Sequence, residues 1–254
     1  MITYKTNEEI EILREGGRRL ACVVEAASQM VAPGITTKEI DARVKQLIED
    51  GGDTAAFLGY TPDGANRPFP GAICISVNDE VVHGVPGGYA LQGGDIVGLD
   101  CGLLHKGLYT DHAVTVPVGR VEDTLLELIS VTKEALAVGI AHATPGCYIG
   151  DISHAIQEVL EAHRYGIVRE LAGHGVGYKV HEEPYVPNYG KKGTGPLLKT
   201  GMVLALEPMA TLGRADIETD EDDGYTIRTV DRSMAAHFEH TIAITKNGPE
   251  ILTT

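Results

Sequence analysis

The 254-residue chain has no tryptophan, only three phenylalanines and only four cysteines. None of the cysteines lies in a CxxC pair, which argues against a zinc knuckle or a disulfide framework. We expect reduced thiols in a cytoplasmic protein, with the cysteine side chains acting as small apolar groups. The four are Cys22, Cys74, Cys101 and Cys147.

Long hydrophobic runs and positive charge are also scarce. No stretch approaches the roughly 18 apolar residues that a membrane span needs. The opening segment, "MITYKTNEEIEILREGG", lacks the apolar region of a signal peptide. Acidic residues outnumber basic ones by 36 to 21, and the formal net charge is −15. This charge disfavours nucleic acids and anionic membranes, so we expect neither as a partner.

Capping signals predict two helices near the start of the chain. The first is bounded by Thr6 with Glu9 and by a stop near Val31, the second by Thr36 with Glu39 and by Gly51-Gly52. Apolar runs between turn signals predict strands. We expect them around residues 72–78, 95–103, 108–117, 168–173, 201–207, 225–230 and 237–245.

The second half of the chain repeats the plan of the first. Segments 33–50 and 145–162 share a Pro-Gly entrance and matching apolar residues. Those apolar matches fall at helical spacing, so chance explains part of the likeness. The constant offset favours duplication. We therefore expect one domain, 1–254, with pseudo-two-fold halves of about 1–120 and 121–254 and a sheet covered by helices on one side.

The stretch "GLDCGLLHKGLYTDHAVTV" predicts a hairpin that turns at Lys106-Gly107. In that register Asp100 pairs with Ala113, so Asp111 lies diagonally from Asp100 on the same face. Aspartate is depleted in strands, and a buried carboxylate needs a partner. Two solvated residues are the plain alternative, but the apolar neighbours favour a bound cation.

Further polar residues interrupt or end other apolar runs: His83, His174 and His181, Glu207, and Glu239. Singly, each histidine could be structural and each glutamate a solvated strand end. Together with the two aspartates, Glu207 and Glu239 make four carboxylates, accompanied by a histidine inside apolar strands. Without cations these carboxylates would repel one another or take up protons. Oxygen-rich ligation with one imidazole suits Mn²⁺, Fe²⁺, Co²⁺ or Zn²⁺.

Taken in order, these motifs resemble the methionine aminopeptidases of the pita-bread fold. They are Asp100, an eleven-residue step to Asp111, "GHG" with His174, "EP" with Glu207 and "FEHT" with Glu239. The resemblance spans essentially the whole chain and implies an α+β fold with a central, mostly antiparallel sheet. The short interval from His174 to Glu207 resembles the type I enzymes, and we expect the short bacterial form without a zinc-binding extension.

The resemblance implies a hydrolase that removes the initiator methionine and favours a small second residue. It implies two divalent metal ions, Co, Mn, Fe or Zn, held by Asp100, Asp111, His174, Glu207 and Glu239. His83 and His181 are implied to contact substrate. General chemistry fits: Glu207 can transfer a proton, and His181 can donate to the oxyanion.

Tyr60, Cys74 and Tyr225 match substrate-pocket residues, although tryptophan is common at the position of Tyr225. Phe57 stands where bacterial members often have a small residue, and Val180 replaces an aromatic one. The 61–70 loop is longer than its bacterial counterpart. The acidic run at 216–224 is expected to form a solvated hairpin tip.

Two other readings stay open at this point. One is a prolidase or aminopeptidase P-like hydrolase of the same fold, and the other is a non-catalytic peptide-binding module. The implied partners are nascent polypeptide N-termini, with ribosome association left open, and we expect a monomer.

Overall fold

The computed structural model describes residues 1–62 and 67–254. Four helices occur in this part of the chain: α1 Asn7–Met30, α2 Thr37–Asp50, α3 Asp123–His142 and α4 Ile149–Ala162. Both predicted capping boxes are confirmed. The Thr6 hydroxyl accepts the backbone N–H of Glu9 while the Glu9 carboxylate accepts that of Thr6, and Thr36 and Glu39 repeat the arrangement.

The strands are short except for one long hairpin. Those of the first half are β1 Thr54–Ala55, β2 Cys74–Val77, β3 Glu80–Val82, β4 Ile96–His105 and β5 Leu108–Pro117. Those from the middle of the chain are β6 Gly166–Ile167, β7 Ala172–Gly175, β8 Glu182–Pro187, β9 Val203–Leu206 and β10 Met209–Thr211. The remainder are β11 Ile217–Thr219, β12 Ile227–Thr229, β13 Ala235–His237, β14 Glu239–Thr245 and β15 Gly248–Ile251.

The main sheet is antiparallel and runs in the order β1-β4-β5-β14-β9-β7-β8, with β2 on β4 and β15 on β14. The β4–β5 register confirms the predicted hairpin: Asp100 pairs with Ala113 and Gly102 with Asp111. Directly paired residues share a face, so the two aspartates point to the same side.

A symmetric pair of threonine contacts joins the two halves at the centre of the sheet. The Thr241 hydroxyl accepts from the backbone N–H of Asp111 at 2.8 Å and donates to its carbonyl at 2.7 Å. Thr115 makes the same pair of bonds with the backbone of His237, at 2.9 and 2.8 Å. The two contacts flank the Ala113–Glu239 pair in the register of β5 and β14. This symmetry fits a duplication, and the domain boundaries stay a prediction.

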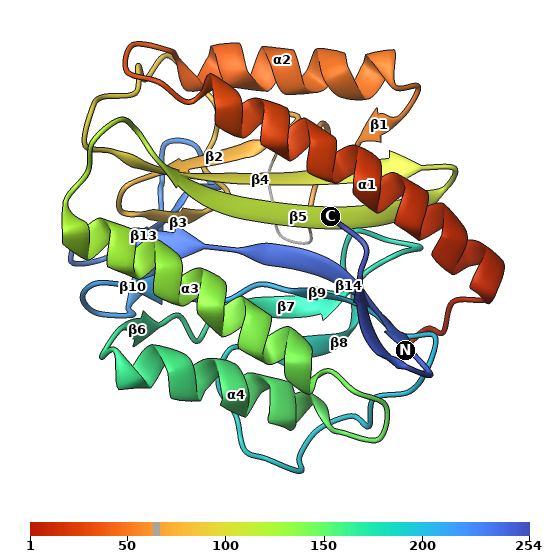
Figure 1. Cartoon of the computed structure of the whole chain (residues 1–254). Helices are drawn as coiled ribbons and strands as arrows, with labels where there is room; N and C mark the ends of the chain where they lie inside the picture. Colours follow the sequence, from red (N-terminus) through yellow and green to blue (C-terminus); the bar gives the residue numbers. More distant parts are fainter. Residues whose placement is uncertain (63–66) are drawn as a thin grey trace.

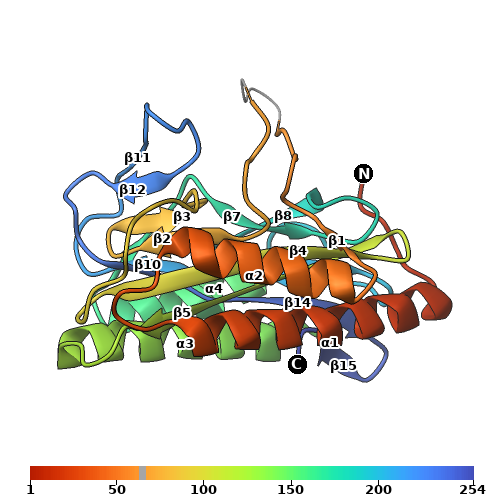
Figure 2. The ribbon, with the colours of Figure 1, turned by 90° about the horizontal axis from the view of Figure 1, so that it is seen from above.

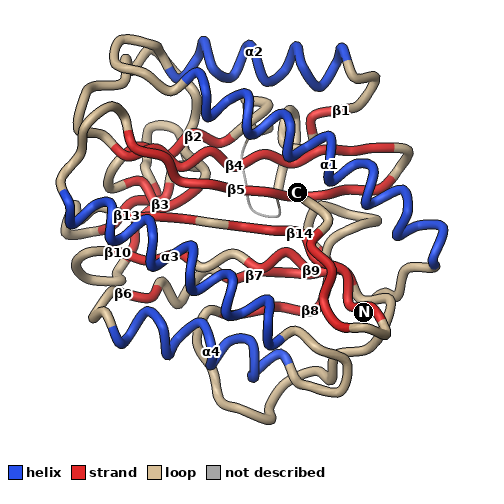
Figure 3. Tube along the Cα trace, viewed as in Figure 1, coloured by secondary structure: helices blue, strands red, loops and turns tan. Residues whose placement is uncertain are grey.

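The helices lie on one face of the sheet, as expected, while long loops rise from the other (Figures 1 and 2). The tube view shows α1 and α2 over one end of the sheet and α3 and α4 over the other (Figure 3). Each helix pair has its own core. Buried residues of α1 and α2, such as Leu20 and Ile40, pack with Leu99 of β4, while Leu128 and Ile152 of α3 and α4 belong to the second core.

Some predicted strands have different limits. The strand expected around 168–173 overlaps β7 only at residues 172–173. Residues 168–171 lie between β6, which belongs to the three-stranded sheet β13-β10-β6, and β7 of the main sheet. There Arg169 and Glu170 are exposed, and the Arg169 guanidinium lies 4.5 Å from the centroid of the Tyr189 ring. The strand expected at 237–245 is interrupted at Phe238.

The acidic run 216–224 forms strand β11 and the turn to β12, with a largely exposed tip, as predicted. Residues 63–66 of the loop predicted to be long lie outside the described residues.

Candidate metal centre

Five neighbouring strands each bring one predicted ligand to the middle of the sheet. Asp100 lies on β4, Asp111 on β5, Glu239 at the start of β14, Glu207 directly after β9, and His174 on β7. These strands are consecutive in the order β4-β5-β14-β9-β7. Residues far apart in sequence therefore meet because the sheet places their strands side by side.

The register explains which side chains share a face. His174 pairs with Ala205, Ala205 pairs with Thr241, and Thr241 is bound to the backbone of Asp111. Asp111 and His174 thus lie in one row across four strands. In the adjacent row Asp100 and Glu239 both pair with Ala113.

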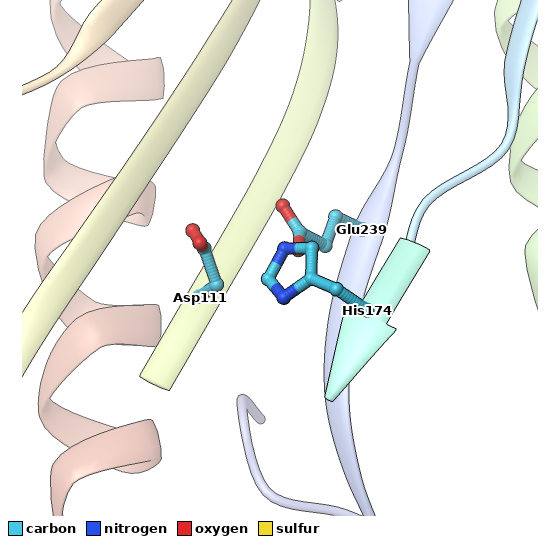
Figure 4. Close-up of side chains that lie close together, drawn as sticks. All are labelled: Asp111, His174 and Glu239. Carbon is cyan, nitrogen blue, oxygen red and sulfur yellow. The ribbon is translucent and has the colours of Figure 1, made fainter. Parts of the chain in front are cut away.

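The side chains converge closely enough to hold a cation. One ligand atom from each of Asp111, His174 and Glu239 lies within 4.8 Å of the others, and all three residues are buried (Figure 4). Glu207 joins this group, because its Oε1 lies 3.5 Å from the Nε2 atom of His174.

Burial of four carboxyl groups in one place raises their pKa values. Loss of hydration raises the pKa of Asp100 to about 7 and that of Glu207 to about 8. The pKa values of Asp111 and Glu239 also rise, first because of burial and then because neighbouring carboxylates repel the charged forms. A divalent cation would reverse this effect by neutralising the ionised groups.

Unpartnered oxygens support such a cation. Among the described residues, the buried Asp100 Oδ1 and Glu239 Oε1 atoms have no hydrogen-bond partner. Buried carboxylate oxygens are costly to leave unpaired. Four carboxylates with one imidazole form a donor set that suits a first-row divalent metal, so these residues fit a metal centre.

All the predicted ligand and substrate residues line one cavity. Besides the five predicted ligands, its lining includes His83, His181, Tyr60, Cys74 and Tyr225, together with Phe57 and Phe69. Phe69 meets Tyr225 edge to face, with ring centroids 5.2 Å apart. The cavity thus combines a polar end with an apolar wall that includes Phe69.

The two histidines outside the predicted ligand set lie at the cavity in different ways. His181 is exposed; its Nδ1 lies 3.0 Å from the Tyr60 hydroxyl, and its ring packs edge-on against His174. His83 has a left-handed backbone with φ of 59°. Burial, with smaller effects of His181 and His237, lowers the pKa of His83 to about 4, so its imidazole is neutral at pH 7.

Sequence reasoning missed one residue of this group, His237 on β13. Its side chain is buried, and its Nε2 atom lies 3.4 Å from Oε2 of Glu207. Its sequence position offers a signal, because a strand at 237–245, as expected from the sequence, would place His237 on the same face as Glu239 two positions later.

No helix in the described part of the chain is long and apolar enough to cross a membrane.

A fold of this kind with a buried carboxylate–histidine centre is that of a metal-dependent hydrolase. Residues 11–246 match the metallopeptidase family M24, and the chain belongs to that family. It is 45% identical to methionine aminopeptidase 1 of Bacillus subtilis and 44% identical to the methionine aminopeptidase of Clostridium perfringens. Each comparison covers 100% of this chain and 99% of the relative.

Solved structures agree on the fold. The methionine aminopeptidase of Thermotoga maritima superposes with a TM-score of 0.95 at 43% identity, and each chain is covered completely. A prolidase from Pyrococcus furiosus gives 0.79 at 25% identity, and the match covers 99% of this chain and 65% of the prolidase. The predicted α+β pita-bread fold is confirmed. Membership of this family implies the use of divalent metal.

Proposed function

We propose that this protein is a methionine aminopeptidase that removes the initiator methionine from nascent proteins and peptides. The observation that carries the proposal is the single cavity in which five convergent ligand candidates face an apolar wall. Such a cavity suits one apolar side chain beside a hydrolytic centre. Full-length identity of 43–45% to methionine aminopeptidases supports the choice of substrate.

We assign the metal centre to Asp100, Asp111, His174, Glu207 and Glu239. Four ionised carboxylates carry a charge that two divalent ions would balance, and Co, Mn, Fe and Zn all suit the donor set. When bound, such ions polarise a peptide carbonyl and activate water for hydrolysis.

The surrounding side chains supply binding and proton transfer. Glu207 is placed to accept a proton and to deliver it to the leaving amide nitrogen. His181, oriented by the Tyr60 hydroxyl, can donate to the oxyanion. The neutral His83 can hydrogen-bond near the scissile amide.

The apolar wall is assigned to the methionine side chain. Phe57, Phe69, Cys74, Val180 and Tyr225 form one buried cluster, with Tyr60 packed against it. A second, more open groove shares His174 and His181 with the cavity. It offers the rest of the polypeptide a way out, which fits an enzyme that removes a single terminal residue.

Two other functions are less well supported. A prolidase-like activity fits the fold, but the identity to a prolidase is 25% against 43% to a methionine aminopeptidase. A peptide-binding module without catalysis would not need a complete set of five ligands.

The cellular setting follows from the proposed activity. Nascent polypeptide N-termini are the proposed partners, and the compartment is proposed to be the cytoplasm. Monomeric state and ribosome association stay predictions.

The test compares Met-Gly-, Met-Leu- and formyl-Met-Gly-peptides with each metal added to metal-free protein. Free methionine should appear fastest from the Met-Gly peptide. The formylated peptide should be inert, because a blocked amine cannot act as the terminal anchor. Equal rates on the blocked and free peptides would exclude an aminopeptidase.

A further inference from the structure

A buried ion pair lies directly beside His181, outside the metal centre. The Lys5 ammonium lies 2.8 Å from Oε2 of Glu182, and the side chains are 1% and 5% exposed. Lys5 also donates to the Thr3 hydroxyl, which donates to the same carboxylate oxygen, each at 2.5 Å. Charged pairs this deeply buried are costly to form unless further bonds satisfy them. Here such bonds are present.

The other carboxylate oxygen of Glu182 shapes the turn that precedes it. Oε1 accepts the backbone N–H groups of Tyr178, at 2.5 Å, and Lys179, at 3.0 Å. Burial would raise the pKa of Glu182, but the hydrogen bonds and charge of its partners hold it below its usual value, so it is ionised. An ionised oxygen binds two turn amides strongly. The turn that ends at His181 is therefore closed by this carboxylate.

Lys5 holds the same turn from its other side. Its ammonium lies 4.8 Å from the centroid of the Tyr178 ring, and the Tyr178 hydroxyl donates to Glu9 of α1 at 2.8 Å. Gly177 has a φ of 140°, and a Cβ there would lie 2.3 Å from Cε of Lys5. The backbone N–H of Lys5 in turn donates to the Gly201 carbonyl at 2.7 Å. The lysine is thus fixed between this turn and the segment that leads into β9.

We propose that Lys5 and Glu182 are positioning residues for His181, so that the segment before α1 forms part of the catalytic apparatus. The inference rests on the proposed function, because it assigns His181 a role in the reaction. The ion pair sets the position of the turn, and the turn sets where the imidazole lies relative to Tyr60 and His174. A displacement of about 1 Å in a catalytic group can lower a rate by about 100-fold.

The test begins with Lys5→Met, which keeps the length of the side chain and removes its charge. We expect kcat on a Met-Gly peptide to fall by about 10- to 100-fold, with KM and bound metal unchanged. The double variant Lys5→Met/Glu182→Gln should recover part of the loss. It removes the unpaired buried charge and keeps an oxygen for the turn amides.

Arg14→Met is the matched control. Arg14 makes an ion pair of 2.6 Å with Glu250, which joins α1 to β15, so its loss also loosens α1. Its kcat per folded, metal-loaded molecule should equal that of the wild type. A purely structural role of Lys5 would make Lys5→Met behave in the same way, with lower thermal stability and unchanged kcat.

A double-mutant cycle tests whether Lys5 acts on the reaction through His181. In a His181→Ala background, Lys5→Met should change kcat by less than about twofold, because the positioned group is already absent. A loss as large as in the wild-type background would show that Lys5 acts elsewhere, and the proposal would be wrong.

Imidazole carbon–proton NMR signals give a readout independent of activity. The His181 signal, assigned by its loss in His181→Ala, should move in Lys5→Met and stay in place in Arg14→Met. An unmoved signal would overturn the proposal. If the wild type released no methionine while this signal still moved in Lys5→Met, the proposed function would fail and the positioning of His181 would stand.

Discussion

The roles proposed for individual side chains at the cavity are of two kinds, holding metal and contacting substrate. His174 is buried within 4.8 Å of two carboxylates, whereas His181 is exposed and faces the Tyr60 hydroxyl. We expect the His181→Ala variant to keep its metal. Its kcat should fall by about 10²–10³-fold, which is the usual loss when one hydrogen-bond donor to the oxyanion is removed. His174→Ala should lose metal as well as activity. Elemental analysis together with steady-state kinetics distinguishes the two variants. Metal loss from the His181 variant would contradict the assignment of His181 as a residue that contacts substrate.

A glycine opposite Asp111 makes room for the wall of the cavity. A Cβ at Gly102 would lie 2.7 Å from Cε1 of Phe57, whereas a Cβ at Gly98 on the same strand would meet Ser76 at an ordinary 3.6 Å. Gly102→Ala should therefore displace Phe57, raise KM for Met-peptides and lower the free energy of unfolding by about 1–3 kcal/mol. Gly98→Ala is the control. Similar KM values in the two variants would show that Phe57 does not bound the substrate site.

Among the elements of the fold, helices α1 and α2 and the hairpin were predictable because their signals are local. Thr6 and Thr36 begin helices through contacts three residues away, and the Lys106-Gly107 turn fixes the register of β4 and β5. The sequence could thus place Asp100 and Asp111 on one face. The approach of His174 and Glu207 depends on the order of distant strands, which only the resemblance to a known family supplied.

Short strands were less predictable than long ones. Apolar residues around Val168 predicted a strand, but residues 168–171, with the exposed Arg169 and Glu170, lie outside the strands. His237 was missed because its partner, Glu207, comes from another part of the chain. In both cases the outcome depended on tertiary packing, although for His237 the two-residue spacing to Glu239 was a local signal.

Two threonine–backbone contacts link β5 to β13 and β14, and we call this junction the seam. It connects the centre of the sheet to the proposed metal centre. Thr241 binds the backbone of the ligand candidate Asp111, while Thr115 binds that of His237 in the same way. Thr241→Val and Thr115→Val should each cost about 1–3 kcal/mol in stability, because buried backbone groups lose their partner. Only Thr241→Val should also weaken metal affinity, measured by titration calorimetry. Equal affinities in both variants would show that the seam does not position Asp111.

At the scale of the whole molecule, the carboxylate cluster should make the metal-free protein sensitive to pH. Asp100 and Glu207 have folded pKa values of about 7 and 8, above the usual values for unfolded carboxyls. The folded state then binds more protons than the unfolded one, so the contribution of these carboxyls to stability is greatest at low pH and is lost as pH rises through these values. Buried histidines act in the opposite direction below about pH 6.5, because they protonate only on unfolding.

The carboxylates therefore dominate between about pH 6.5 and 8.5. In that window the free energy of unfolding of the metal-free protein should fall as pH rises, by up to about 1.4 kcal/mol per pH unit for each proton released. Urea unfolding in the presence of a chelator at several pH values measures this free energy. Flat or rising stability across the window would mean that the four carboxyls are hydrated and do not interact.

Metal should reverse this penalty, and Asp111→Asn separates charge repulsion from metal binding. Metal that binds only the folded state adds about 2.7 kcal/mol at a hundredfold excess over Kd. The asparagine removes one of the repelling charges, so the metal-free variant should be more stable than the metal-free wild type at pH 8. It should also gain less from added Co²⁺ or Mn²⁺, because one anionic ligand is missing. The measurement is thermal unfolding of both proteins with chelator and with metal. A variant that is no more stable without metal, yet gains as much from metal as the wild type, would show that Asp111 contributes neither to the charge cluster nor to the metal centre.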